Sequence, residues 1–290
     1  MTHDRAALGA FLRSRRDRLT PSQAGLQAFP GARRVPGLRR DELAFLAGLS
    51  PDYYSRVEQG RQANISPEVL DALARALRLD EVERAHLHNL AAPGPRRHAR
   101  PPALQRPDPG LLRLISTLDH VPVLLLGQRG DVLARNALLC AVLGRPLEPG
   151  TSFMRFLFHD PMARERIINW ADFASAAVAT LRWETGRRPH DRALLALIDE
   201  LRAADEDVAR WWGDHTVRDY APVAKRIQHP AAGTLLFDIE IVVSPHEPEQ
   251  RLIVYTAEPD SRTARLLPIL ASWDIETLPP AESTTSNGPR

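Results

Sequence analysis

At 290 residues the chain is long for one hydrophobic core, which favours two domains. Its residues are 43% hydrophobic and 26% charged, which is ordinary for a globular protein. No stretch is apolar enough for a membrane span or a secretion signal. The single cysteine, Cys140, cannot form an internal disulfide, which fits a reducing cytoplasm. Residues 1–100 carry 17 Arg against 11 Asp plus Glu, whereas the remainder has 21 basic and 25 acidic residues, so only the front of the chain is expected to meet a polyanion.

The first predicted element is a helix over residues 4–19, with an apolar stripe that faces a core. The stretch 40–60, RDELAFLAGLSPDYYSRVEQG, then predicts two helices joined by a tight turn. Ala44 and Gly48 are small where we expect the two backbones to approach closely. This pattern is typical of a helix-turn-helix, whose second helix enters the DNA major groove.

The second helix of this pair begins with Ser50 as its cap and Pro51 at its first position. Its spacing places Tyr54 and Val57 inward. Arg56 can bond guanine, or hold a phosphate. The residues expected to contact DNA are Arg39, Arg40, Ser50, Asp52, Tyr53, Ser55, Arg56, Gln59, Arg61 and Asn64. The alternative is a small helical bundle whose polar face is only solvated.

Two more capped helices follow, starting at Ser66 and Asp80, which completes a compact all-α domain over residues 1–91. Residues 92–109 are rich in Pro and Arg and predict a semi-rigid linker. Residues 110–276 predict a second domain, and residues 277–290 a disordered tail.

The second domain has two short strand-like runs near residues 121–135, helical patterns across 136–213, and three further strand-like runs between 223 and 258. Strands, a helical insertion and strands again indicate an α+β domain around one antiparallel sheet. The chain is therefore expected to be multidomain, with an all-α helix-turn-helix bundle followed by this α+β domain.

The stretch 43–60 resembles the Xre-type (Cro-repressor-like) helix-turn-helix family, in which LAxxAGxSxxYxSRxExG is the recurring pattern. Downstream, DVLAxN at 131–136, Trp212 with His215, HP at 229–230 and VYTAEP at 254–259 are similar to MmyB-like regulators. The resemblance implies a bacterial transcription regulator with a PAS-like C-terminal domain that holds a fatty-acid-like ligand. Arg135 departs from the family, which usually has Trp there.

We expect this ligand to be a small apolar or amphipathic molecule. The candidate ligand-binding residues are Leu124, Asn136, Trp212, His215 and His229. For Trp211, Trp212 and His215, core packing with one satisfied histidine is the alternative to lining a pocket. We also expect a homodimer, because a monomer reads only one half-site of double-stranded DNA.

No catalytic residue, metal site or cofactor is predicted. His86 and His88 are two apart on a helix and cannot share one metal, so solvated or capping roles are expected. Cys140 reads as a small core residue. Two rival functions for the second domain stay open: a protein-interaction module, and an enzyme acting on a small acyl molecule. The excess of arginine has an alternative explanation. Lys225 is the only lysine, and a GC-rich gene would also favour arginine over lysine.

Overall fold

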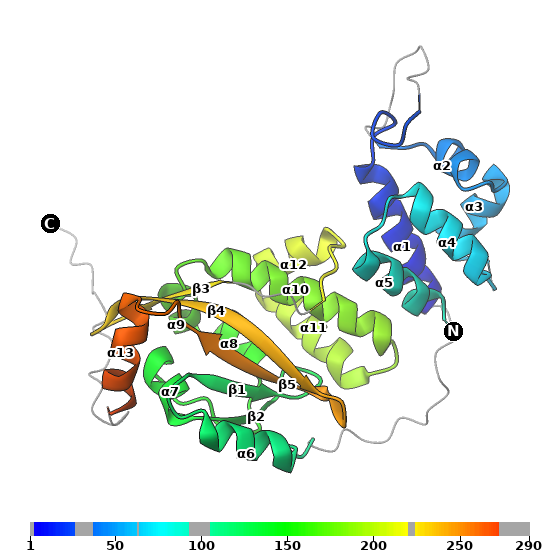
Figure 1. The fold of residues 1–290 in the computed structure, drawn as a ribbon. Coiled ribbons are helices and arrows are strands. Elements are labelled where there is room, and N and C mark those ends of the chain that lie inside the picture. Colours follow the sequence, from blue (N-terminus) through cyan, green and yellow to red (C-terminus); the bar gives the residue numbers. More distant parts are fainter. Residues whose placement is uncertain (1–2, 27–36, 63, 93–104, 220–223, 273–290) are drawn as a thin grey trace, which may run out of the picture. The chain divides into compact units, whose positions relative to one another are not determined.

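The computed structural model describes residues 3–26, 37–62, 64–92, 105–219 and 224–272 (Figure 1). These residues form two compact units. The first comprises residues 1–101 and 175–219, and the second comprises residues 102–174 and 220–290, within those described ranges. The predicted tail at 277–290 and most of the predicted linker lie outside the described residues.

The N-terminal part of the first unit is a bundle of helices, as the sequence predicts. Its helices are α1 (His3–Arg18), α2 (Arg40–Leu46), α3 (Pro51–Glu58), α4 (Pro67–Ala76) and α5 (Glu81–Ala91). Three of them begin at side-chain caps, since Ser50, Ser66 and Asp80 each accept a hydrogen bond from the backbone N–H three residues later. Tyr54 and Val57 lie in the common core, at 0% and 1% exposure.

Two glycines fix how α1, α2 and α3 meet. A Cβ on Gly9 of α1 would lie 2.1 Å from the carbonyl oxygen of Glu58, so only glycine allows this approach. Gly48 differs from the expectation: no other atom lies within 4 Å of a Cβ built there, and its φ is +68°. Gly48 is therefore needed for a left-handed turn between α2 and α3, not for close packing.

The rest of the first unit comes from residues 175–219. These residues contain the greater part of α10 (Trp170–Arg187), all of α11 (Arg192–Ala204) and all of α12 (Glu206–Gly213). Val217 belongs to the buried cluster formed by the N-terminal bundle, and Trp183 of α10 packs against it. Segments that are about one hundred residues apart in sequence thus share one core.

The second unit is built on a five-stranded antiparallel sheet in the order β2-β1-β5-β4-β3 (Figure 1). Its strands are β1 (Val123–Leu126), β2 (Val132–Arg135), β3 (Lys225–His229), β4 (Gly233–Ser244) and β5 (Glu247–Thr256). The late strands continue a sheet begun a hundred residues earlier, because β5 pairs with both β1 and β4. This is the α+β architecture with an antiparallel sheet and a helical insertion that the sequence predicts.

Helices accompany this sheet. They are α6 (Pro109–Thr117), α7 (Ala137–Leu143), α8 (Phe153–His159), α9 (Pro161–Arg166) and α13 (Arg262–Ala271). In α7, Cys140 is fully buried, and burial raises the pKa of its thiol. The reading of Cys140 as a small core residue is confirmed.

Lys225, at the start of β3, is fully buried in the second unit. Its Nζ donates to the Tyr255 hydroxyl at 3.2 Å and lies 4.4 Å from the centre of the Phe173 ring and 5.3 Å from that of Phe153. Burial lowers the pKa of Lys225 to about 7. The aromatic faces partly replace the water that an ammonium loses on burial.

Candidate DNA-binding surface and ligand pocket

The α3 helix presents a polar outer face, as a recognition helix must. Ser50 Oγ accepts a hydrogen bond from the Tyr53 backbone N–H at 3.1 Å, which fixes the start of the helix. Because Tyr54 and Val57 point into the core, the residues between them are left outside. Asp52, Arg56 and Gln59 are exposed, and Tyr53 and Ser55 are half-buried. The expected inward face is confirmed, and so is the outward position of Asp52, Arg56 and Gln59, whereas Ser55 is half-buried.

Two internal pairs order the outer face. Arg56 Nη1 lies 2.8 Å from Asp52 Oδ2, one helical turn away, and Gln59 Nε2 donates to Ser55 Oγ at 3.1 Å. An exposed pair of this kind contributes only about 0.3–0.5 kcal/mol, so a base or phosphate can displace it at little cost. These two contacts order the side chains before DNA binds, and Asp52 is positioned to orient the guanidinium of Arg56.

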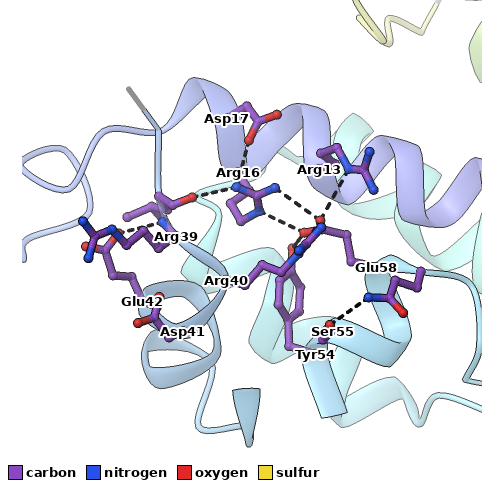
Figure 2. A network of polar contacts seen from close by, with 12 residues as sticks. Arg13, Arg16, Asp17, Arg39, Arg40, Asp41, Glu42, Tyr54, Ser55 and Glu58 are labelled. Atoms are coloured by element: carbon purple, nitrogen blue, oxygen red, sulfur yellow. Dashed lines mark hydrogen bonds and ion pairs between the residues drawn. The ribbon is translucent and has the colours of Figure 1, made fainter. Parts of the chain in front are cut away.

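Beneath this face, the buried carboxylate of Glu58 joins three helices (Figure 2). Arg16 of α1 approaches it with two nitrogens, at 2.9 and 3.2 Å, and the Tyr54 hydroxyl donates to it at 2.7 Å. Arg40 of α2 donates at 2.9 Å, and Arg13 Nε lies 3.4 Å away. Burial raises the pKa of Glu58, but the hydrogen bonds from Arg16 and Tyr54 outweigh it, so the net pKa lies below its usual range. Glu58 is therefore an ionised hub.

Arginines from two helices gather beside this hub. Arg13, Arg16, Arg39 and Arg40, with Asp17, line a surface cleft of about 460 Å³. Arg39 and Arg40 are exposed, which leaves them available to a phosphate. Arg61 lies with Arg13 and Gln59 along a neighbouring cleft, and Asn64, also exposed, accepts through its carbonyl a hydrogen bond from Gln62. The predicted DNA-contacting residues thus lie on or beside the helix-turn-helix.

Three of the five candidate ligand residues lie within the fold of the second unit. Leu124 is fully buried in β1. Asn136 caps α7 and donates to the carbonyls of Leu118 and Val121 at 2.8 and 2.7 Å. His229 Nε2 lies 3.1 Å from the Ala141 carbonyl, and its Nδ1 accepts from two backbone N–H groups. These polar groups hold strands and turns together. Burial, the main cause, lowers the pKa of His229, which favours its neutral form.

The other two, Trp212 and His215, line a cavity of about 430 Å³ in the first unit. His215 follows α12 with a φ of +53°, a left-handed conformation that is uncommon for a residue with a side chain. Its carbonyl accepts a hydrogen bond from Arg15 at 2.8 Å, and its Nδ1 lies 3.1 Å from Arg182 Nη1. Trp212 and His215 thus belong to the first unit, whereas Leu124, Asn136 and His229 belong to the second.

Comparison with known proteins gives the family. The model of the MmyB-like transcription regulator ligand binding domain matches residues 107–270, and a helix-turn-helix domain model matches residues 7–87. The chain belongs to the MmyB-like transcription regulators. The first match covers more than half of the chain, and the two together account for both parts of the predicted architecture. No curated protein matches the chain.

This MmyB-like regulator is thus a DNA-binding transcription regulator with a ligand-binding domain, and its family is not one of enzymes. The matched ligand-binding domain includes residues 175–219, which pack with the N-terminal bundle in the first unit. None of the helices in the described ranges has the length and apolar character needed to cross a bilayer. Within the same ranges, no group of three or more His, Cys, Asp or Glu side chains is arranged to hold a metal ion.

Arg135, at which the sequence departs from the pattern of the resemblance, bonds to the loop after α7. Its Nε donates to the Leu147 carbonyl at 3.2 Å, and its Nη2 lies 3.3 Å from Glu148 Oε1. The side chain is 24% exposed. The substitution therefore gives this regulator a polar link between β2 and the loop at 147–148.

Sequence reasoning missed several polar residues of the first unit. His86 was expected to be solvated or capping, but it is 2% exposed, with its ring edge against Phe11 at a centroid distance of 5.1 Å. That expectation is wrong, because α10 covers this face of α5: a Cβ on Gly186 would lie 2.5 Å from His86 Nδ1. Arg16 and Arg182 were missed too. The contacts that join Arg16 to Glu58 and Arg182 to His215 span 42 and 33 residues, and local spacing gives no signal for them.

Proposed function

We propose that the regulator reads a specific operator through Asp52, Ser55, Arg56 and Gln59, and that Arg39, Arg40 and Arg61 hold the DNA backbone. The observation that carries this is the capped α3 helix, which presents four polar side chains above a hub that ties α1, α2 and α3 together. Base contacts give sequence preference, while the flanking arginines give affinity that falls as salt rises.

Selection from a pool of random duplexes tests this assignment. The full-length protein is incubated with the pool, bound DNA is recovered, and the enriched sequence serves as the probe for titrations. Enrichment of one half-site that contains guanine is expected, since arginine most often recognises guanine. Recovery of an unenriched pool would contradict sequence-specific reading by α3.

We further propose that the ligand is a small amphipathic molecule of the fatty-acid type. The supporting observation is the cavity beside Trp212 and His215, whose volume of about 430 Å³ lies within the range of ordinary small-molecule sites. Native mass spectrometry of the full-length protein should show a bound mass of lipid size. The titrations with the selected duplex are then repeated on the protein after delipidation.

We also propose that the regulator acts as a homodimer in the cytoplasm, where its DNA lies. In the second unit, Leu236, Val242 and Val243 of β4 and Ile269 of α13 are each roughly half exposed, and such apolar side chains suit a second copy. Light scattering coupled to gel filtration should give twice the mass of one chain. A monomer that still recruits another protein through these residues would favour the interaction-module alternative.

A further inference from the structure

The cavity of the first unit has an apolar wall contributed by both sequence segments. Phe11 of α1 and Leu90 of α5 come from the helix-turn-helix domain, whereas Leu195 and Ile198 come from α11. Phe11 and Ile198 are buried, and Leu90 and Leu195 are half-buried. This apolar wall suits an aliphatic chain. None of its four residues was predicted from the sequence as a ligand-binding residue.

Part of the lining of the same cavity is basic. We call Arg15, His86, Arg182 and His215 the basic cluster. Arg182 Nη2 donates to the Trp212 carbonyl, and its guanidinium lies 4.1 Å from the centre of a ring of Trp212. Arg15 donates to His215 and is 5% exposed. Three of the four residues line the cavity, and Arg15 is joined to one of them, His215, through its backbone carbonyl.

The basic cluster has less negative than positive charge around it. Arg15 is paired with Glu83, at 2.8 Å. Arg182 is 8% exposed, and only the charge of Asp214 favours its ionised form, without a carboxylate at ion-pair distance among the described residues. Asp199, the only carboxylate that lines the cavity, lies 3.4 Å from Arg202. Arg182 Nε and His86 Nδ1 are both buried without a hydrogen-bond partner in the described part of the chain.

The pKa values of Arg182, His86 and His215 agree with this shortage of negative charge. Burial, reinforced by the charge of Arg15, lowers the pKa of Arg182 to about 9. Burial and the neighbouring Arg182 also lower the pKa of His86 to about 3 and that of His215 to about 4, so both rings are neutral near pH 7. A buried cation without a counterion is strongly unfavourable, and an incoming anion would relieve it.

We infer that this cavity binds an amphipathic anion, with its acid group beside Arg182 and His215 and its chain along Phe11, Leu90 and Ile198. The inference rests on the proposed ligand-sensing function. It adds the charge of the ligand, the residues that recognise it, and a site shared with the DNA-binding bundle.

The shared site gives the ligand a direct route to the DNA reader. Ala6, Ala7, Ala10 and Phe11 of α1 face the cavity, while Arg16, farther along the same helix, holds the Glu58 hub. A bound ligand therefore contacts α1 and α11 at once, and joins the ligand-binding domain to the helix that supports α3. Ligand binding controls how firmly α1 is held against α10–α12.

Calorimetric titration of the full-length, delipidated protein with three decyl probes tests the site. Decanoate should bind one-to-one and at least 10-fold more tightly than decanol or decyltrimethylammonium, which share its chain but lack its negative charge. Arg182→Gln should weaken decanoate binding by about 10- to 100-fold, as expected for lost hydrogen bonds to a charged group. Arg210→Gln is the matched control, because Arg210 is an exposed arginine of α12 that does not line the cavity.

A second variant guards against misfolding of Arg182→Gln. Ala7 is exposed at the cavity wall, so Ala7→Phe fills space without removing a buried contact. It should abolish decanoate binding while the circular dichroism spectrum and melting curve stay unchanged. Hydrogen exchange should show that decanoate protects residues 5–12 of α1 as well as α11 in the wild-type protein, and neither in Ala7→Phe.

The following results would each overturn the inference. Equal affinity for decanol removes the requirement for an anion, and decanoate binding that survives both variants moves the site elsewhere. Protection of α11 without α1 removes the shared site. If no decyl probe binds, the inference fails, whereas the proposed ligand-sensing function fails only if no small molecule of any kind copurifies or alters binding to the selected duplex.

Discussion

Two clusters of buried charge in the first unit differ in how completely they are neutralised. Around Glu58, one buried carboxylate is met by Arg16, Arg40 and the Tyr54 hydroxyl, and its two oxygens are fully occupied. In the other cluster, the buried guanidinium of Arg182 meets the Trp212 carbonyl and the neutral ring of His215, and the Arg182 Nε and His86 Nδ1 atoms stay unpaired in the described residues. The comparison indicates that the first cluster is a structural hub, and it supports the proposal that the second cluster binds an anion.

Removing the centre of the closed cluster should have the largest effect. Glu58→Gln removes the buried counterion of Arg16, which is 7% exposed, and leaves it only the half-exposed carboxylate of Asp17 at 2.8 Å, so the free energy of unfolding should fall by roughly 3–5 kcal/mol. Urea denaturation of the full-length protein, followed by circular dichroism, measures this. Glu81→Gln, at an exposed position in the first turn of α5, should change stability by under about 1 kcal/mol. Equal losses in the two variants would remove the special role of Glu58.

A change on the surface above the hub should weaken DNA binding without unfolding the bundle. Arg56→Ala is expected to cost about 1–3 kcal/mol of binding to the selected duplex if Arg56 contacts a guanine in bidentate fashion. Arg39→Ala should instead weaken binding to all duplexes and reduce the slope of log K against log salt by about 1. Fluorescence anisotropy at several salt concentrations separates the two. Identical behaviour of both variants would make Arg56 a phosphate contact.

The open cluster predicts a pH dependence of stability. His86 has a folded pKa of about 3, below the ordinary value of 6.5, because burial and then the charge of Arg182 oppose its protonation. The stability from neutral His86 is complete above pH 6.5 and is lost as pH falls toward 3, since the unfolded chain binds the proton first. Between pH 7 and 5 this loss should be roughly 1–2 kcal/mol.

Thermal melts of the wild-type protein and His86→Phe across this interval measure the effect. The variant keeps an aromatic ring beside Phe11 but cannot titrate, so its melting curve should depend less on pH. His88→Phe is the control, because His88 is only partly buried and bonds to Asp71 at 2.9 Å. A pH dependence that is the same in all three proteins would place the titrating group elsewhere.

The sequence specified local features far better than the buried charge. The capping signals at Ser50 and Ser66 and the inward spacing of Tyr54 and Val57 could be read directly, since they depend on neighbours within one helical turn. The need for Gly48 was recognised, but its physical reason, a positive φ, was not. His86 reads as a polar surface residue, because nothing near it in sequence indicates that α10 covers it.

Neither cluster of buried charge could be predicted from the sequence, because the contacts in each join residues far apart in the chain. Arg16 lies 42 residues from Glu58, and Arg182 lies 33 residues from His215, so neither contact has a local pattern. Trp212 and His215 were found as candidate ligand residues through a family resemblance, which carries no information on the side chains around them. Arg15, Arg182 and the walls from α1 and α5 required the folded chain.

The smallest predicted effect concerns the exposed pair on α3, which tests the comparison at its weak end. Asp52→Asn removes the partner 2.8 Å from Arg56, but both side chains are solvated, at 78% and 49% exposure, so the melting curve should shift by the equivalent of under about 0.5 kcal/mol. The freed Arg56 should still bind the selected duplex, with affinity changed mainly through the lost negative charge near phosphates. Melting curves and anisotropy measure the two quantities. A stability loss as large as that of Glu58→Gln would mean that burial does not decide which charged contacts hold this bundle together.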